Sequence, residues 1–379
     1  MSVGAAAPVL GPLTQTPPVP AAVSEASGPS TLGWIARGAV MGGLAMLVLV
    51  FPLSRDGIEV NVYTEAVIYA IIGLSLNVLL GYAGQISLGH QAFVGIGAFT
   101  AAYMTSVHEQ NFVAAVGVTM VVGAVQALLL GFVSVRITGL YFALVTLTYG
   151  MMAENSLFNI ASLTGGSAGQ AAPKPAGFAS DYRYYYLCLA FLAVVLFVDW
   201  RLTSTKTGRA LLAIRQDPRV AASFGAGLKR YILIAFVVSG VFASLGGALL
   251  AYNTTAVVSS QFTFQLALVF VIMTVVGGLR SRAGVVVASA FFSLTAYLFD
   301  KLRLYAVIDA IPGLPAMPAD LAPLVIGPLL LIFTLTRHPG GFGQILRPIG
   351  RWLRGAPSSR PPVTTASVSG PSVGAKAHA

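Results

Sequence analysis

The chain has 379 residues, of which 56% are hydrophobic and only 9% are charged, and its formal net charge is +10. Soluble domains carry about 25% charged residues, so this composition excludes an ordinary soluble protein and indicates a polytopic membrane protein. The single cysteine, Cys188, excludes a disulfide framework and a cysteine-based metal site.

The two ends of the chain differ from its middle. Residues 1–34 are rich in Ala, Pro, Ser and Gly, and residues 347–379 form a basic tail without apolar periodicity. Both segments are predicted to be largely disordered. The first apolar run follows Arg37 and is typical of an uncleaved membrane span, so no cleavable signal peptide is expected.

Between these ends, residues 35–346 are predicted to form the transmembrane domain. A bilayer core needs about 20 mostly apolar residues per helix. On that template we expect an all-α integral membrane protein with about ten transmembrane helices. These predicted spans cover residues 35–53, 61–80, 90–107, 112–135, 140–159, 184–200, 231–252, 262–279, 284–299 and 321–336.

A polar break separates the second predicted span from the third. Glycines and hydrogen-bonding side chains interrupt the apolar run there, and unpaired polar backbone is costly in hydrocarbon unless protein buries it or water reaches it. The break is therefore a candidate translocation pathway or gate, while helix packing and backbone capping stay open for each side chain alone. Its candidate residues are Gly84, Gln85, Ser87, Gly89, His90 and Gln91.

Two acidic residues within predicted spans are candidates for an outer vestibule. At ~1.5 Å of rise per residue, Glu65 and Glu154 both fall near the outer ends of their helices. An interfacial or helix-packing carboxylate is the alternative for each. The turn-forming run that includes Thr164, Gly165 and Gly166 is either a gate in the same vestibule or a connector.

The loop over residues 201–230 is strongly basic. It holds seven Lys and Arg residues against one acid, Asp217, so it is predicted to be cytoplasmic. Alternation from this loop places both termini inside, together with 17 of the 22 Lys and Arg residues. The basic charge is therefore a topology signal, and no nucleic-acid partner is expected.

The same loop has the pattern of two short helices. An amphipathic stretch ends at Gln216, Asp217-Pro218 is typical of a helix cap and first turn, and Gly225 is a natural stop. Such a basic helix pair could lie on anionic membrane lipid or dock a cytoplasmic motor.

Enzymatic motifs are absent from the sequence. No histidine pair has a metal-binding spacing, no G-x-S-x-G elbow occurs, and no lysine follows a glycine as in the phosphate-binding loop of ATPases. We expect neither catalysis, nor a metal, nor a bound cofactor on this chain. If ATP drives its activity, another chain binds and hydrolyses it.

Several segments together resemble the permease subunits of bacterial branched-chain amino-acid ABC importers, closer to the M-type subunit than to the H-type. They occur in the family's order and cover roughly residues 36–346. The segments are GLSLNVLLGYAGQISLGHQAFVGIGAFTAAY, YFALVTLTYG followed by LTGGSAG, GRALLAIRQDPRVAASFG, and VVGGLRSRAG.

The resemblance implies the function and the partners. The chain would be an inner-membrane subunit that moves branched-chain or related apolar amino acids inward, together with a second homologous permease, two cytoplasmic ABC ATPases and a periplasmic solute-binding protein. The cytoplasmic loop would couple to the ATPase. Its coupling residues would be Gly208, Arg209, Arg215, Gln216, Asp217, Ala221, Ala222 and Gly225.

The chain departs from the family pattern at a few positions. Ser223 stands where an acidic residue is common, Arg280 and Arg282 replace small or apolar residues of a Gly-Gly-Leu-Gly-Ser motif, and Val285 takes a place often held by proline. These departures bear on the identity of the ATPase partner and on local loop geometry.

Other functions stay open at this stage. Related permeases carry urea, amides or aromatic acids, and no residue here excludes these solutes. A self-sufficient secondary carrier or channel is the alternative from another class; it would transport without any ATPase partner, whereas an ABC permease would not.

Overall fold

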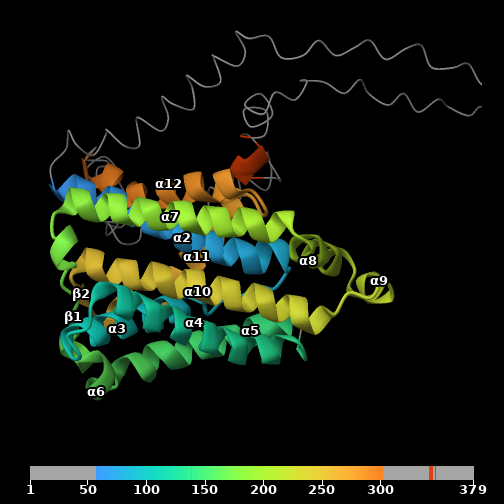
Figure 1. The fold of residues 1–379 in the computed structure, drawn as a ribbon, viewed down its shortest axis with the longest axis horizontal. Helices are drawn as coiled ribbons and strands as arrows, with labels where there is room; N and C mark the ends of the chain where they lie inside the picture. Colours follow the sequence, from blue (N-terminus) through green and yellow to red (C-terminus); the bar gives the residue numbers. More distant parts are fainter. Residues whose placement is uncertain (1–56, 138, 302–340, 345, 347–379) are drawn as a thin grey trace, which may run out of the picture. The chain divides into compact units, whose positions relative to one another are not determined.

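The computed structural model describes residues 57–137, 139–301, 341–344 and 346. All of them belong to one compact unit, Gly43–Gly350, which is built almost entirely of helices (Figure 1). The first elements along the chain are α2 (Gly57–Leu76), the π-helix η2 (Asn77–Tyr82), α3 (His90–Ser106), α4 (Phe112–Ser134) and α5 (Leu140–Asn155).

Short elements and a second set of long helices follow. The short ones are η3 (Leu157–Asn159), α6 (Ala161–Thr164), η4 (Gly166–Ala168), β1 (Gln170–Ala171) and η5 (Ala176–Phe178). The remaining elements are α7 (Asp181–Ser204), α8 (Lys206–Gln216), α9 (Pro218–Ser223), α10 (Leu228–Thr254), β2 (Ala256–Val257), η6 (Ser259–Gln261), α11 (Phe264–Gly277) and α12 (Arg282–Lys301).

Helices α2 and α10 form the centre of the bundle. Both are mostly apolar and largely buried within the described part of the bundle. α10 packs against α2, α3 and α4, and α2 also packs against α7 and α12. By contrast α4, α5 and α7 leave apolar side chains exposed, as helices at the edge of a membrane bundle do.

Small residues let α10 approach its neighbours closely. A Cβ atom on Gly247 would lie 1.9 Å from the Val94 carbonyl oxygen of α3, and one on Gly97 would lie 2.4 Å from the Ser244 carbonyl oxygen of α10. Close helix contact through glycine is the common packing mode inside membranes, where no hydrophobic driving force holds helices together.

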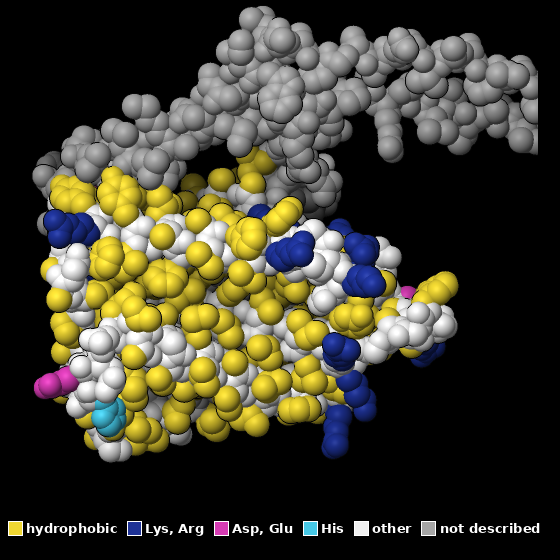
Figure 2. All heavy atoms as spheres, in the orientation of Figure 1, with side chains coloured by type: hydrophobic (Ala, Val, Ile, Leu, Met, Phe, Trp, Pro, Cys, Tyr) yellow, Lys and Arg dark blue, Asp and Glu magenta, His cyan; other side chains and the backbone are white. Residues whose placement is uncertain are grey.

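The short elements and the helix pair α8–α9 lie at opposite ends of the bundle. β1 pairs antiparallel with β2, with Gln170 opposite Val257 and Ala171 opposite Ala256, and this ties the loop after α5 to the end of α10. α8 and α9 project from the other end, and most of the Lys and Arg side chains visible on this face gather there (Figures 1 and 2).

The structure supports a polytopic membrane protein. Eight of the ten predicted spans correspond to helices, and the other two, residues 35–53 and 321–336, lie outside the described residues. Within the described part, five helices are long and apolar enough to cross a membrane. The total of ten, the cytoplasmic placement of both termini, and the disorder of 1–34 and 347–379 stay predictions.

Candidate functional site

The break between α2 and α3 occupies residues 83–89, and a π-helix leads into it. η2 has wider turns than an α-helix, with the Ala83 amide donating to the Val78 carbonyl at 3.2 Å. π-helical turns inside longer helices frequently mark functional sites. Gly84 follows with a φ of +70°, a backbone conformation that favours glycine.

The second half of the break is packed against α5. A Cβ atom on Gly89 would lie 1.9 Å from the Thr146 carbonyl oxygen, and the Leu88 amide donates to the Thr146 hydroxyl at 3.0 Å. Gln91 reaches the same helix, because a Cβ atom on Gly150 would lie 2.5 Å from its amide nitrogen. The end of the break and the start of α3 are therefore packed directly against α5.

Buried hydrogen bonds connect α3, α2 and α10 beside the break. The Ser75 hydroxyl donates to the Ile72 carbonyl at 2.6 Å and lies 2.6 Å from Nε2 of His90. Because a hydroxyl has one hydrogen, His90 donates from Nε2, which leaves Nδ1 as an acceptor. Ser239 on α10 donates to the Ser75 carbonyl at 2.8 Å.

Several polar atoms of the break and of the first turn of α3, where the structure places His90 and Gln91, are buried without a partner among the described residues. They are the Ser87 hydroxyl, His90 Nδ1 and both polar atoms of the Gln91 amide. Ser87 is 1% exposed, and His90 and Gln91 are fully buried. Buried groups of this kind are rare in proteins and call for a functional or hydration role. Gln85, also buried, accepts from the Ser134 hydroxyl at 3.2 Å.

The basic loop over residues 201–230 folds into the expected pair of helices. The Asp217 carboxylate caps α9 by accepting from the Arg219 and Val220 amides at 2.8 and 3.2 Å. The chain leaves α9 at Gly225 with a φ of +79°. Gly208 is buried against the end of α7, since a Cβ atom there would lie 2.4 Å from the Thr203 Cα atom.

The other coupling candidates divide between buried and exposed positions. Ala221 is buried, whereas Arg209, Gln216 and Ala222 are exposed. Arg209 also donates to the Ser204 carbonyl at 3.3 Å, which fixes α8 to the end of α7. Arg215 is half-buried and turns inward, donating from Nη1 to the Gly81 carbonyl oxygen of η2. Burial, and then the nearby charge of Arg280, lowers the pKa of the Arg215 guanidinium from its usual range.

The predicted vestibule residues lie on separate elements at the opposite end. Glu154 caps α11, because its carboxylate accepts from the Phe264 amide at 2.9 Å. Glu65 is hydrogen-bonded to Tyr69 one turn further along α2. Gly165 and Gly166 have φ values of +72° and +62° and form the turn after α6.

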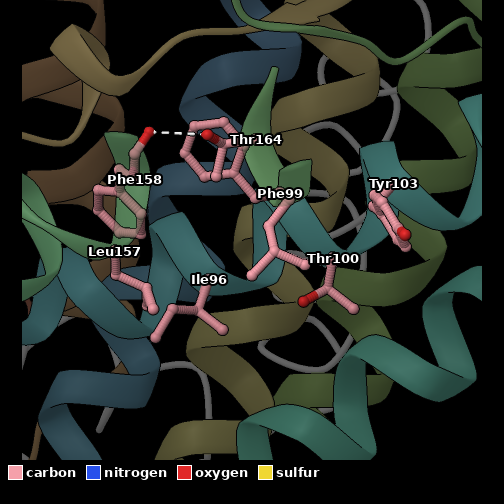
Figure 3. Close-up of a pocket in the computed structure, with 8 residues that line it drawn as sticks. Ile96, Phe99, Thr100, Tyr103, Leu157, Phe158 and Thr164 are labelled. Carbon is pink, nitrogen blue, oxygen red and sulfur yellow. Dashed lines mark hydrogen bonds between the residues drawn. The ribbon is translucent and has the colours of Figure 1, made fainter. Parts of the chain in front are cut away.

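Thr164 lines an apolar pocket of about 230 Å³ between α3 and the loop after α5 (Figure 3). Its hydroxyl donates to the Phe158 carbonyl at 2.9 Å, as the dashed line shows. The side chains that line the pocket are Ile96, Phe99, Thr100, Tyr103, Leu157, Phe158, Leu163 and Thr164.

The structure also reveals a polar cluster that the sequence patterns missed. Asp199 of α7 is fully buried and forms an ion pair with Arg282 of α12, and the Tyr82 hydroxyl of η2 donates to the same carboxylate at 3.0 Å. Asp199 is thus a third acid within a predicted span, besides Glu65 and Glu154. The signal was present, as an acid near the end of an apolar run and an arginine that departs from the family motif.

Phe224 is a second residue whose importance only the structure indicates. It directly follows α9 and is 87% exposed, and Val220 within α9 is 52% exposed. α9 projects from one end of the bundle (Figure 1). Large apolar side chains exposed together on a projecting element are a candidate interaction surface.

The bundle, the membrane-length helices and the polar break define a polytopic membrane permease. The chain belongs to the family described as branched-chain amino acid transport system / permease component, whose model matches residues 58–334. It is therefore a permease of the branched-chain amino acid ABC transport family, which confirms the resemblance seen in the sequence segments.

Curated relatives agree with this assignment. The high-affinity branched-chain amino acid transport system permease protein LivM of Escherichia coli is 28% identical over 341 residues, covering 83% of this chain and 76% of the relative. LivM of Salmonella typhimurium is 29% identical over 293 residues, covering 70% and 69%. A probable LivM of Methanocaldococcus jannaschii is 24% identical over 314 residues, covering 72% and 90%. No solved structure matches the chain.

Proposed function

We propose that this chain is one permease subunit of an ATP-driven importer that moves branched-chain or related apolar amino acids inward across the bacterial inner membrane. A second homologous permease completes the pathway, two cytoplasmic ABC ATPases bind and hydrolyse ATP, and a periplasmic solute-binding protein delivers the solute. The names of the curated relatives support the solute class.

The observation that carries the ATPase partnership is the α8–α9 pair. A basic surface surrounds its base, and the apolar side chains of Val220 and Phe224 are exposed at its tip. An interfacial lipid-binding helix would bury its apolar residues along one long face. A compact apolar tip within a charged rim instead has the composition of a protein interface, with an apolar centre and a polar border.

The break supports a pathway role for Gly84, Gln85 and the buried residues that follow. Ser87, His90 and Gln91 bring polar atoms that have no partner among the described residues to the point where η2 ends and α3 begins. Inside a membrane such groups persist where a hydrated path or a passing solute satisfies them. We assign this segment to the inner gate, because it lies at the same end of the bundle as α8 and α9.

The outer pocket supports an apolar solute. Its volume is about 230 Å³, and its walls are mainly aromatic and aliphatic side chains with a few hydroxyls, a lining that suits a branched aliphatic side chain better than a charged one. Glu65, Glu154, Thr164, Gly165 and Gly166 frame the outer end in this proposal.

The decisive experiment is reconstitution in liposomes. The chain with its permease partner, the two ATPases and the binding protein should take up radiolabelled leucine only when ATP is present on the ATPase side. Uptake by the chain alone would instead establish a self-sufficient carrier or channel. Competition by urea, short amides or aromatic acids in the complete system identifies the solute if leucine is not carried.

The coupling surface has its own test in Phe224→Ser. We expect the variant to insert normally but to lose at least about tenfold in ATPase affinity, because hot-spot aromatic residues contribute ~2 kcal/mol or more to an interface. Gly177→Ser, an exposed outer-loop substitution in open space, is the control. Unchanged ATPase binding and uptake in Phe224→Ser would show that this part of the α8–α9 pair does not contact the ATPase.

A further inference from the structure

Arg215 joins the cytoplasmic helix pair directly to the break. Its guanidinium donates from Nη1 to the carbonyl oxygen of Gly81, at the end of the π-helix. Carbonyl oxygens at the end of a helix lack intrahelical donors, so an arginine can satisfy one from outside. Arg215 lies 134 residues away in the chain, at the end of α8.

Gly84 makes room for the stem of the same side chain. A Cβ atom on Gly84 would lie 2.9 Å from Cγ of Arg215 and 3.6 Å from its Cβ. Glycine at this position therefore serves two purposes: it adopts the left-handed backbone and it admits the arginine. The guanidinium and the stem together hold the break at two points, on either side of Ala83.

The contact borders open space on its other side. Arg215, Gly84, Gln85 and Ile86 line a pocket of about 530 Å³ that extends to Lys229 at the start of α10. Interiors of folded proteins are close-packed, so this pocket leaves part of the boundary between α8 and the break unpacked. Leu211 and Ile214 bury α8 against the core, and Arg215 supplies its hydrogen bond to the end of η2.

The other side of η2 is held by elements that do not belong to the loop. Asn77 accepts from the Arg280 amide at 2.8 Å, and Tyr82 donates to Asp199, which is paired with Arg282. These contacts tie the π-helix to α7 and to the turn between α11 and α12 that leads into Arg282. Arg215 is accordingly the point at which a displacement of α8 and α9 would act on the break against a fixed support.

We propose that Arg215 is the positioning residue that transmits the movement of the α8–α9 pair to η2, releasing the break when the pair shifts. This inference rests on the proposed function, since the movement is supplied by an ATPase partner. It places the transmission in a side-chain contact at the Gly81 carbonyl, in addition to the covalent connections of α8 and α9 to the long helices α7 and α10.

The test is a disulfide across this contact. Gly84→Cys and Arg215→Cys are combined in a Cys188→Ala background, where the Cβ separation of 3.6 Å falls within the range of about 3.5 to 4.5 Å that disulfides require. The assembled transporter in proteoliposomes is oxidised, assayed for uptake and ATP hydrolysis, reduced and assayed again. Both single-cysteine variants are treated in parallel.

Every variant with Arg215→Cys lacks the guanidinium, so we expect it to start from the reduced coupling of such a chain. Oxidation should lower the remaining uptake at least tenfold in the double variant alone, and reduction should restore that starting level. Uptake by the cross-linked transporter equal to that of its reduced form, or failure of the two cysteines to cross-link in the complex, overturns the inference and leaves the proposed function intact. Absence of ATP-dependent uptake in the wild-type complex overturns the proposed function itself.

A second pair of variants tests the guanidinium. Arg215→Met keeps the stem but loses the donor, and we expect at least tenfold more ATP hydrolysed per solute carried, with Arg215→Lys partly restoring the ratio. Arg136→Met removes an arginine that is exposed near the same end and should leave that ratio unchanged. A parallel fall of hydrolysis and uptake in Arg215→Met would indicate a merely structural side chain and overturn the proposal.

Discussion

One departure of this chain from its family places an arginine in a backbone conformation that favours glycine. Arg280 has a φ of +71°, in the left-handed region that non-glycine residues enter only at a cost. It stands where the family motif has a small residue, and its amide donates to Asn77 of the π-helix. The backbone is thus held in a glycine conformation by a contact that does not depend on the side chain.

Replacement of Arg280 by glycine should stabilise the protein. Relief of the left-handed strain, about 1–2 kcal/mol, exceeds the added chain entropy of glycine in the unfolded state, about 0.5–1 kcal/mol. We expect a net gain of roughly 0.5–1 kcal/mol, measured as a higher midpoint of thermal unfolding in detergent.

The matched control for this change is Arg280→Ala. It removes the same charge beside Arg215 but keeps a Cβ atom at the strained position. A glycine variant no more stable than the alanine variant would show that the backbone strain has no energetic weight here.

At the scale of helices, the pair Asp199 and Arg282 shows how a membrane bundle accommodates a buried charge. Asp199 is fully buried, and its ion-pair partner Arg282 is only 32% exposed. The Tyr82 hydroxyl donates a further hydrogen bond to the Asp199 carboxylate. Removal of one partner from a buried pair leaves an uncompensated charge, which costs far more than the pair contributes.

We expect Arg282→Met to destabilise the protein by about 3–5 kcal/mol, because it leaves the Asp199 carboxylate buried and unpaired. Asp199→Asn combined with Arg282→Met should recover ~1–3 kcal/mol of that loss, as a double-mutant cycle of thermal or denaturant unfolding measures. Additive losses in the double variant would mean that the two side chains do not interact.

Glycine packing among the helices gives a second prediction at this scale. In Gly97→Ala the new methyl group would meet the α10 backbone, so we expect a loss of about 1–3 kcal/mol or more from overpacking. Gly117→Ala on α4 has open space around it and should instead gain up to ~1 kcal/mol from helix propensity. Equal effects of both substitutions on the unfolding midpoint would contradict the close contact between α3 and α10.

The described part of the chain has two chemically distinct ends. The projecting α8–α9 pair and most of the Lys and Arg side chains visible in Figure 2 lie at one end, and the short β1–β2 sheet with its glycine turns lies at the other. The basic end is expected to face the cytoplasm, because Lys and Arg accumulate on that side of bacterial membrane proteins.

Cysteine labelling checks this orientation in cells. In a Cys188→Ala background, Gly177→Cys in the loop before α7 should react with a membrane-impermeant thiol reagent in intact spheroplasts. Ser223→Cys at the exposed end of α9 should react only in inverted membrane vesicles. The opposite labelling pattern would show that the α8–α9 pair faces the periplasm and therefore cannot bind a cytoplasmic partner.

Local sequence patterns were sufficient to predict the class of protein and eight of the transmembrane helices. They also predicted the polar break between the second and third spans and the pair of short helices separated by Asp217. Each of these follows from neighbours in the chain: a run of apolar residues, a cluster of glycines, or a cap beside a proline. Such signals are short-range, so they survive without knowledge of how the helices pack.

Only the tertiary structure showed that Arg215 reaches the Gly81 carbonyl, that Asp199 pairs with Arg282, and that Phe224 is left exposed. The first two contacts join residues 134 and 83 positions apart. The periodicity of a single helix carries no information about which partner faces it, because side-chain partnership depends on how distant helices cross. The cluster around the π-helix is therefore a product of packing, even though every residue in it is visible in the sequence.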